Sequence, residues 1–351
     1  MASRKSPLIA ASLLVLSAVL PTTALAGGGP AVITTISLGP DESATGFALA
    51  VNKQTNKTYV TPGLETLSCE SHIVSVIDNS THTLLAPITA GFNPFGIAVN
   101  ERTNKIYVTN AGGCSEDQQS NTVSVIDGAT DAIKTNITLD GLGPAFVAVN
   151  ATTNKIYVAL NGGCCLSGTK VAVIDGATDT VLRYVEVDPD PFVVAVNPRT
   201  NLVYVTHGAV DRITVIDGTT DTVKTTFSIG SEARGIDFHP NGKFVYVAAR
   251  NTNQMVVVDA SSNTVVQSVP VGLRPHGVLF DPENGRIYVT NRGRCNSTPG
   301  TVSVIDSETL TVVATVQVGA CPRFLDRSRE TGLIYVPNAS TSRSVSVIQD
   351  K

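Results

Sequence analysis

One short phrase recurs seven times along the chain, and each copy centres on a tyrosine in a context such as KIYVTN. The seven copies are marked by Tyr59, Tyr107, Tyr157, Tyr204, Tyr246, Tyr288 and Tyr335. Successive tyrosines lie 42 to 50 residues apart, and each is followed by a second phrase such as VSVID. A period of this size predicts an array of seven equivalent units.

The clearest unit runs from Pro275 to Val318 and shows what each unit contains. It has four runs rich in Val, Ile, Thr and Tyr, with turn residues at Pro282–Gly285 and at Asp306–Thr309. No stretch has the period of a helix, so each run is a predicted strand. The sequence therefore predicts an all-β fold, a seven-bladed β-propeller of four-stranded blades, whose radial closure leaves few exposed edges.

The two ends of the array complement each other. Residues Ala31–Gly39 have the pattern of a fourth strand without the preceding three, whereas the last unit stops after its third strand at Ile348. We therefore expect the N-terminal strand to join the last blade and close the ring. Residues 27–351 then form a single propeller domain.

Residues 1–26 have the pattern of a secretory signal peptide. Arg4 and Lys5 precede an apolar run from Leu8 to Leu20, which is too short for a membrane span. We therefore expect a protein that is secreted or reaches the periplasm or cell surface. Loss of this segment changes the formal net charge from -4 to -6, which argues against a general coat for nucleic acid but allows a local basic patch.

The repeated phrases YVTN, VAVNPRTN and VSVID resemble those of the bacterial and archaeal YVTN-repeat β-propellers, which include YncE-like periplasmic proteins and surface-layer proteins. The resemblance covers essentially the whole chain after residue 26. It implies a seven-bladed propeller outside the cytoplasm. YncE-like members have been linked to single-stranded DNA, so the resemblance also implies that class of ligand.

Most repeated polar residues are interpreted as turn formers. Asn197, Asn201, Asp217 and Asp221 stand beside Pro, Gly or Thr, where their side chains can satisfy the backbone of a turn. Functional residues are therefore sought where the repeats differ from one another.

The position 12 residues before each tyrosine begins the innermost strand, near the mouth of the central channel. It is occupied by Phe47, Phe95, Ala145, Phe192, Arg234, His276 and Arg323. The first four blades therefore contribute aromatic or small groups, and the last three contribute potential cations. Further arginines follow in the loops of the same sector, namely Arg250, Arg274, Arg292, Arg294 and Arg343.

Arginine forks suit carboxylate or phosphate groups, and phenylalanine rings can stack on a flat part of the same ligand. Acidic residues such as Asp188 and Asp190 are expected on the other side of the mouth. The predicted ligand-binding residues are Phe47, Phe95, Phe192, Arg234, Arg250, His276, Arg292 and Arg323.

Two functions agree with this mouth. The favoured one is a monomeric binding module without catalysis or cofactor, whose partner is an anionic small molecule, single-stranded nucleic acid or a protein segment. The alternative is a hydrolase, because PHGVLFDP around His276 is similar to a stretch of lactonase-type propellers. That resemblance implies catalysis by His276 with Arg234 and Arg323, and Glu232 is the candidate for the missing carboxylate.

Six cysteines fall in loops of the mouth face, and their even number in an exported chain suggests disulfides. Cys295 with Cys321 is the preferred pair, because the two belong to adjoining loops of blades six and seven. Cys69 with Cys114, and Cys164 with Cys165, complete the expected set. A thiolate metal site from Cys114, Cys164 and Cys165 with His72 is the alternative, but its spacing matches no zinc pattern, so no metal is expected.

Overall fold

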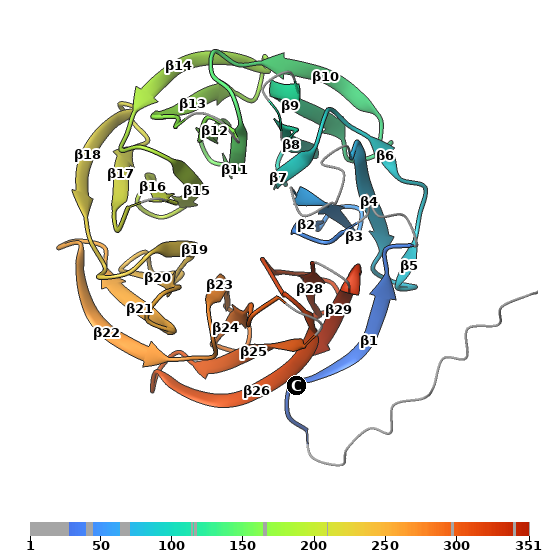
Figure 1. Cartoon of the computed structure of the whole chain (residues 1–351), viewed down its shortest axis with the longest axis vertical. Helices are drawn as coiled ribbons and strands as arrows, with labels where there is room; N and C mark the ends of the chain where they lie inside the picture. The colour runs from blue at the N-terminus through green and yellow to red at the C-terminus, as the bar shows by residue number, and fades with distance from the viewer. Residues whose placement is uncertain are drawn as a thin grey trace, which may run out of the picture.

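The computed structural model describes residues 28–39, 45–63, 71–113, 115, 118–163, 167–208, 210–295, 298–339 and 342–350. These residues form seven antiparallel sheets arranged radially around a central axis, as Figure 1 shows. The prediction of an all-β seven-bladed propeller is confirmed. No helix within the described ranges is long and apolar enough to cross a membrane. The predicted signal peptide, residues 1–26, lies outside the described residues.

The blades are numbered here from the first tyrosine repeat, and each is given from its innermost to its outermost strand. Blade 1 contains β2 (Ala48–Asn52), β3 (Lys57–Thr61), β4 (Ile73–Asp78) and the short strands β5 (Thr83–Leu84) and β6 (Ile88–Thr89). Blade 2 contains β7 (Pro94–Asn100), β8 (Lys105–Gly112), β9 (Gln119–Asp127) and β10 (Ile133–Thr138). Blade 3 contains β11 (Pro144–Asn150), β12 (Lys155–Leu160), β13 (Lys170–Asp175) and β14 (Thr180–Glu186). Blade 4 contains β15 (Pro191–Asn197), β16 (Leu202–His207), β17 (Ile213–Asp217) and β18 (Thr222–Phe227).

The remaining blades follow the same plan. Blade 5 contains β19 (Ala233–Phe238), β20 (Phe244–Ala249), β21 (Gln254–Asp259) and β22 (Thr264–Pro270). Blade 6 contains β23 (Pro275–Asp281), β24 (Arg286–Asn291), β25 (Pro299–Asp306) and β26 (Thr311–Ala320). Blade 7 contains β27 (Asp326–Arg327), β28 (Ile334–Asn338), β29 (Ser344–Gln349) and β1 (Ala31–Ser37).

Closure of the ring joins the two ends of the chain. Strand β1 pairs antiparallel with β29, with Thr34 opposite Val347 and Ser37 opposite Ser344. In Figure 1 the blue strand β1 accordingly lies beside the red strand β29. The predicted closure by the N-terminal strand is therefore confirmed.

The outer strand of blade 1 is irregular. The outer strand of blade 1 is split into β5 and β6, which both pair with β4. Pro87 stands between the two pieces and has no backbone N–H for a ladder hydrogen bond. The sheet of blade 1 is therefore interrupted at its edge and intact at the centre of the ring.

The repeated tyrosines are buried where neighbouring blades meet. The Tyr107 hydroxyl donates a hydrogen bond to Asp179 of the next blade at 2.9 Å, and the Lys105 ammonium group lies 2.7 Å from the same carboxylate. We call this arrangement the blade lock. It recurs between Tyr59, Lys57 and Asp131 and between Tyr157, Lys155 and Asp221. Residues such as Asp221, which the sequence identified only as turn formers, therefore also join the blades.

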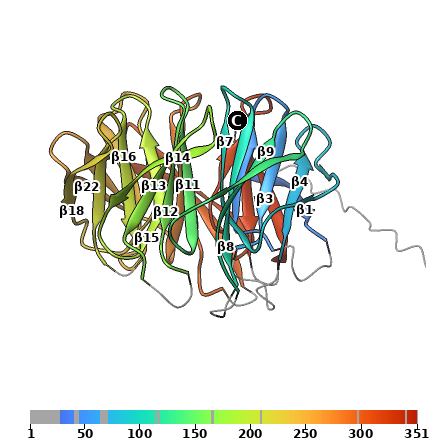
Figure 2. The same cartoon turned by 90° about the horizontal axis from the view of Figure 1, so that it is seen from above.

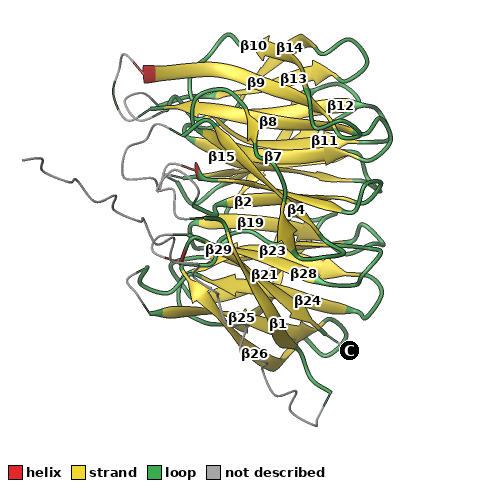
Figure 3. Cartoon of the chain, turned by 90° about the vertical axis from the view of Figure 1, so that its right-hand side faces the viewer, coloured by secondary structure: helices red, strands yellow, loops and turns green. Residues whose placement is uncertain are grey.

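Figures 2 and 3 show the propeller edge on, with its strands running between two faces. One face carries the connections from the second to the third strand and from each blade to the next, and we call it the mouth face. The other carries the turns between the first and second and between the third and fourth strands, and we call it the turn face.

Candidate anion site at the channel mouth

A recurring bulge in the innermost strand aims side chains at the channel. The pairing of β7 with β8 shifts register between Pro94 and Ile97, and the inner strands of blades 3, 4, 5 and 6 shift at the corresponding place. A bulge sets two residues opposite one, so two consecutive side chains can face the same way. In blade 3, Ala145 and Phe146, which stand 12 and 11 residues before the tyrosine, both face the channel for this reason.

Neighbouring inner strands come very close at this bulge. A side-chain carbon on Gly96 would lie 2.4 Å from the carbonyl oxygen of Ala145, and one on Gly277 would lie 2.8 Å from that of Arg323. Only glycine fits between backbones at such separations. The mouth is therefore framed by tightly packed backbone.

Aromatic rings fill the channel below the mouth. The centroids of Phe47 and Phe95 are 4.6 Å apart, and those of Phe146 and Phe192 are 5.3 Å apart. Phe324 joins them, with its centroid 4.4 Å from that of Phe146. We call these five residues the phenylalanine plug. Of the phenylalanines predicted to contact ligand, Phe47 and Phe95 are buried among the other rings, whereas Phe192 is partly exposed.

The sequence analysis missed Phe146 and Phe324. Both stand 11 residues before their tyrosines, one position after the residue chosen from the repeat. The signal was present, because blade 3 has the small Ala145 at the chosen position and a phenylalanine next to it.

His276 lies against the plug. Its ring is edge-on to Phe324 with centroids 4.7 Å apart and edge-on to Phe47 at 6.2 Å. The residue is 2% exposed, and no described residue bonds to its buried Nδ1 atom. Burial, followed by the positive charges of Arg234, Arg292 and Arg250, lowers the pKa of His276 well below its usual value of 6.5. The imidazole is therefore neutral at pH 7.

Two arginines are stacked on phenylalanines of the plug. The Arg323 guanidinium carbon lies 5.2 Å from the Phe47 ring centroid, and that of Arg234 lies 4.6 Å from the Phe192 centroid. Both are cation–π distances. Arg323 is 3% exposed, and burial lowers its pKa to about 9. The cations therefore lie directly over the apolar plug.

The Glu232 carboxylate pairs with two arginines of the mouth. Oε1 of Glu232 pairs with Nη2 of Arg234 and also lies 2.9 Å from Nη1 of Arg250. Burial and the neighbouring Arg250 lower the pKa of Arg234, although Glu232 opposes this shift. Within this cluster of three charged residues, one positive charge exceeds the negative charge.

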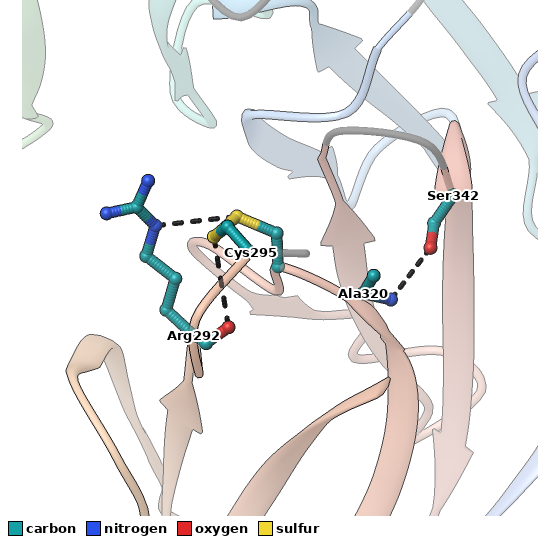
Figure 4. Close-up of a disulfide and its surroundings, with 5 residues drawn as sticks. Arg292, Cys295, Ala320 and Ser342 are labelled. Carbon is teal, nitrogen blue, oxygen red and sulfur yellow. Dashed lines mark hydrogen bonds between the residues drawn. A yellow bond between two sulfur atoms is a disulfide. The ribbon is translucent and has the colours of Figure 1, made fainter. Parts of the chain in front are cut away.

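The disulfide between Cys295 and Cys321 is confirmed, with Cα atoms 4.6 Å apart. Figure 4 shows that the Arg292 side chain reaches it, and Arg292 Nε donates to the Cys321 sulfur at 3.4 Å. Burial, Arg250 and Arg274 lower the pKa of Arg292 to about 10. The predicted cysteines Cys69, Cys114, Cys164 and Cys165 lie outside the described residues.

A second histidine near the mouth, His207, contacts polar groups through both ring nitrogens. His207 is fully buried, with ring nitrogens 3.0 Å from the Pro189 carbonyl oxygen and 2.9 Å from Thr214 Oγ1. On the acidic side of the mouth, Asp188 lies 3.3 Å from Arg212. Burial raises the pKa of Asp190 despite the nearby Arg234 and His207.

Beyond the plug, the channel opens toward the turn face as a cavity of about 400 Å³. Its wall includes Asp237 and Asp326, which the sequence analysis did not single out. The Asp237 carboxylate accepts hydrogen bonds from Phe280 N and Phe238 N, and that of Asp326 accepts from Val51 N. These two carboxylates therefore tie inner strands of adjacent blades together.

Comparisons with known proteins identify propellers. The sequence profile of the cytochrome D1 heme domain family matches residues 197–342, which is less than half of the chain. The solved structure of Kuenenia stuttgartiensis hydrazine synthase is similar with a TM-score of 0.73 and 19% identity, covering 89% of this chain and 97% of that chain. No curated protein sequence matches significantly.

The matched family raises the question of a heme. A protein-bound heme iron takes an axial ligand such as a histidine with a free ring nitrogen. His276, the one histidine among the eight predicted ligand-binding residues, is 2% exposed and is packed against Phe47 and Phe324. These residues as arranged do not fit a heme, and we derive no heme chemistry for this chain. The comparisons support a seven-bladed propeller related in fold to the cytochrome D1 heme domain.

Proposed function

We propose that the protein is an exported propeller of the YVTN-repeat type that binds an anionic ligand at the channel mouth. The observation that carries this proposal is the pairing of Arg234 and Arg250 with the single carboxylate of Glu232. A carboxylate or phosphate oxygen of a ligand can pair with the guanidinium N–H groups of Arg234 and Arg250 that do not contact Glu232.

The other cations of the mouth strengthen the argument. The pKa values of Arg292 and Arg323 are lowered, which means that their surroundings disfavour the charged form. For Arg292 the positive charges of Arg250 and Arg274 contribute to this effect. A bound anion relieves such repulsion, so the cluster favours anionic ligands over neutral ones.

The phenylalanine plug defines where the ligand lies. Because rings such as Phe47 and Phe146 are packed together across the channel, the ligand rests on the mouth and does not thread through the ring. Phe192 is partly exposed beside Arg234, so it offers an apolar contact next to a cation. This combination suits single-stranded nucleic acid, an acidic protein segment or an anionic small molecule.

The geometry favours binding over hydrolysis. A general base must reach the proton it removes, whereas His276 is 2% exposed. Glu232, the candidate carboxylate for a lactonase-like site, is engaged by two arginines. We therefore propose a monomeric binding module without catalysis. Its disulfide agrees with export to an oxidising compartment.

The proposal is tested by titrating the purified protein with three probes, a short oligothymidylate, a glutamate-rich peptide and inorganic phosphate, at two salt concentrations. At least one probe is expected to bind with an affinity that falls as salt increases. Arg234→Ala should weaken this binding about tenfold, as expected for loss of a charged hydrogen bond. Arg323→Ala should also weaken it, because it removes a positive charge from beneath the mouth. Lys243→Ala, which removes one exposed positive charge from the turn face, should change it less than twofold.

Unchanged affinity in both arginine variants, or no binding of any probe, would overturn the proposal. Thermal unfolding of each variant shows whether a loss of binding reflects a loss of folding. A lactone hydrolysis that the wild type performs and His276→Ala abolishes would establish the hydrolase instead.

A further inference from the structure

We propose that the Cys295–Cys321 disulfide is a thiol–disulfide exchange site with a fixed direction. An incoming dithiol attacks Cys295, and Cys321 departs as a thiolate held by Arg292. The exchange site shares Arg292 with the anion site proposed above. It differs in its substrate, which is a dithiol, and its chemistry requires no anionic ligand.

Accessibility determines which sulfur is attacked. Cys321 is fully buried, whereas Cys295 is partly exposed. Thiol–disulfide exchange requires the attacking thiolate, the attacked sulfur and the departing sulfur to come together. Attack from solvent is therefore expected at Cys295.

Charge determines which sulfur departs. Arg292 Nε donates to the Cys321 sulfur at 3.4 Å, whereas the Cys295 sulfur lies 3.9 Å from the Arg292 carbonyl oxygen (Figure 4). A guanidinium group beside a sulfur lowers the pKa of the thiol, and a thiol of low pKa is the better leaving group. Cys321 is therefore the preferred leaving group.

The charges around Arg292 also favour a thiolate. Arg250 and Arg274 add positive charge near Arg292, and Glu232 adds a smaller opposing effect. A thiolate on Cys321 therefore forms in a region where positive charge exceeds negative charge. Such a region stabilises the anion that leaves.

The backbone around Cys321 has anchors besides the disulfide. Ala320 N donates to Ser342 Oγ at 2.7 Å, as Figure 4 shows, and Ala339 N donates to the Cys321 carbonyl oxygen at 3.1 Å. These bonds to blade 7 do not depend on the sulfur–sulfur bond. The reduced Cys321 thus stays near Arg292, and the disulfide can form again.

The exchange proceeds in two steps. The first thiolate of the dithiol forms a bond to the Cys295 sulfur, and the electron pair of the broken disulfide goes to the Cys321 sulfur. The second thiol of the dithiol loses its proton and attacks the mixed disulfide, which releases Cys295 as a thiolate that takes up a proton. The dithiol is thereby oxidised to a disulfide, and the two protein cysteines are reduced.

The direction of attack can be measured on the wild-type protein without any ligand. The folded protein is treated with excess glutathione, a monothiol that traps the mixed disulfide, and free thiols are then alkylated. Cleavage after Glu308 separates Cys295 from Cys321 for mass spectrometry. Glutathione is expected on Cys295 and the alkyl group on Cys321, and the reverse pattern would overturn the proposal.

The role of Arg292 is tested by the rate of reduction with dithiothreitol in native buffer. Arg292→Gln should slow this reduction about tenfold, because a neighbouring cation lowers a thiol pKa by about one to five units and part of that shift appears in the rate. Arg274→Gln, which removes a nearby charge but not the contact with sulfur, should slow it less than threefold. Equal rates in Arg292→Gln and the wild type, or reduction that occurs only when the protein unfolds, would refute the exchange site while leaving the anion site untouched.

Discussion

The hydroxyl of Tyr107 donates a hydrogen bond to Asp179 of the neighbouring blade at 2.9 Å. Burial and the negative charge of Asp179 raise the pKa of Tyr107, so the hydroxyl remains a donor at any physiological pH. The same contact is absent at the seam between blades 4 and 5. There Asn263 takes the place of the aspartate, and no described residue bonds to the buried Tyr204 hydroxyl.

Replacement of Tyr107 by Phe should therefore lower the free energy of unfolding by about 1.5 to 3 kcal/mol, the usual contribution of a hydrogen bond to a charged group. Tyr204→Phe is the matched control, because it removes the same hydroxyl from the same strand position. Its free energy of unfolding should change by less than about 0.5 kcal/mol or increase, since the Tyr204 hydroxyl is buried without a bond. Urea unfolding of both variants measures the difference, and equal losses would show that the blade lock adds nothing.

The contacts of the blade lock can be introduced at the seam between blades 4 and 5 by two substitutions. Leu202 occupies the position of Lys105 and Lys155, and it borders a cavity of about 620 Å³ between blades 4 and 5. Leu202→Lys and Asn263→Asp should each destabilise the protein, because each introduces a charge without its partner. Combined, they should show a favourable coupling energy of at least about 1 kcal/mol in a double-mutant cycle. Additive effects of the two changes would contradict the assigned geometry of the lock.

The contacts of the blade lock could not be predicted from the sequence. The period of the tyrosines and the turn phrases predicted the propeller, because these signals are local and repeat in every unit. Aspartates at this turn position, such as Asp221, were interpreted only as turn residues of their own blades. The bond from Tyr107 to Asp179 spans 72 residues and depends on how two blades pack, which no local pattern contains.

The residues of the mouth were predicted only in part. Counting 12 residues back from each tyrosine identified His276 and Arg323, because equivalent positions of a repeat face the same axis. The bulge, which brings Phe146 to the channel beside Ala145, was not visible in the repeat. Asp237 was missed although it left a trace, since it stands where blades 1 to 4 have Ala50, Ala98, Ala148 and Ala195.

The channel carboxyl of Asp237 should make stability depend on pH. Burial, and to a lesser extent the charge of Asp326, raises the pKa of Asp237 from 3.8 to about 6 in the folded protein. The folded state thus holds this proton more tightly than the unfolded state, so stability is lost as the pH rises from about 4 through 6. Asp237→Asn should gain up to about 3 kcal/mol relative to the wild type over this range.

Urea unfolding of both proteins at several values between pH 4 and pH 7 checks this trend. Asp259→Asn serves as the control, because hydrogen bonds from Ser261 and Ser262 lower the pKa of Asp259 to about 2. The stability that Asp259 adds is lost only as the pH falls toward 2, so its variant should show little trend from pH 4 to pH 7. A constant difference between Asp237→Asn and the wild type would mean that Asp237 is not titrating in this range.

Strand β1 should hold the ring closed. A chain that begins at Leu38 lacks the ladder between β1 and β29 and the buried Ile36 side chain, whereas one that begins at Ala31 keeps both. The shorter chain should lose at least about 3 kcal/mol, because a buried isoleucine and several ladder hydrogen bonds disappear together. The edge of β29 is then unpaired, so a peptide with the sequence of residues 31–39 should bind and restore part of the thermal stability. Equal melting temperatures for the two chains would show that the ring closes without this strand.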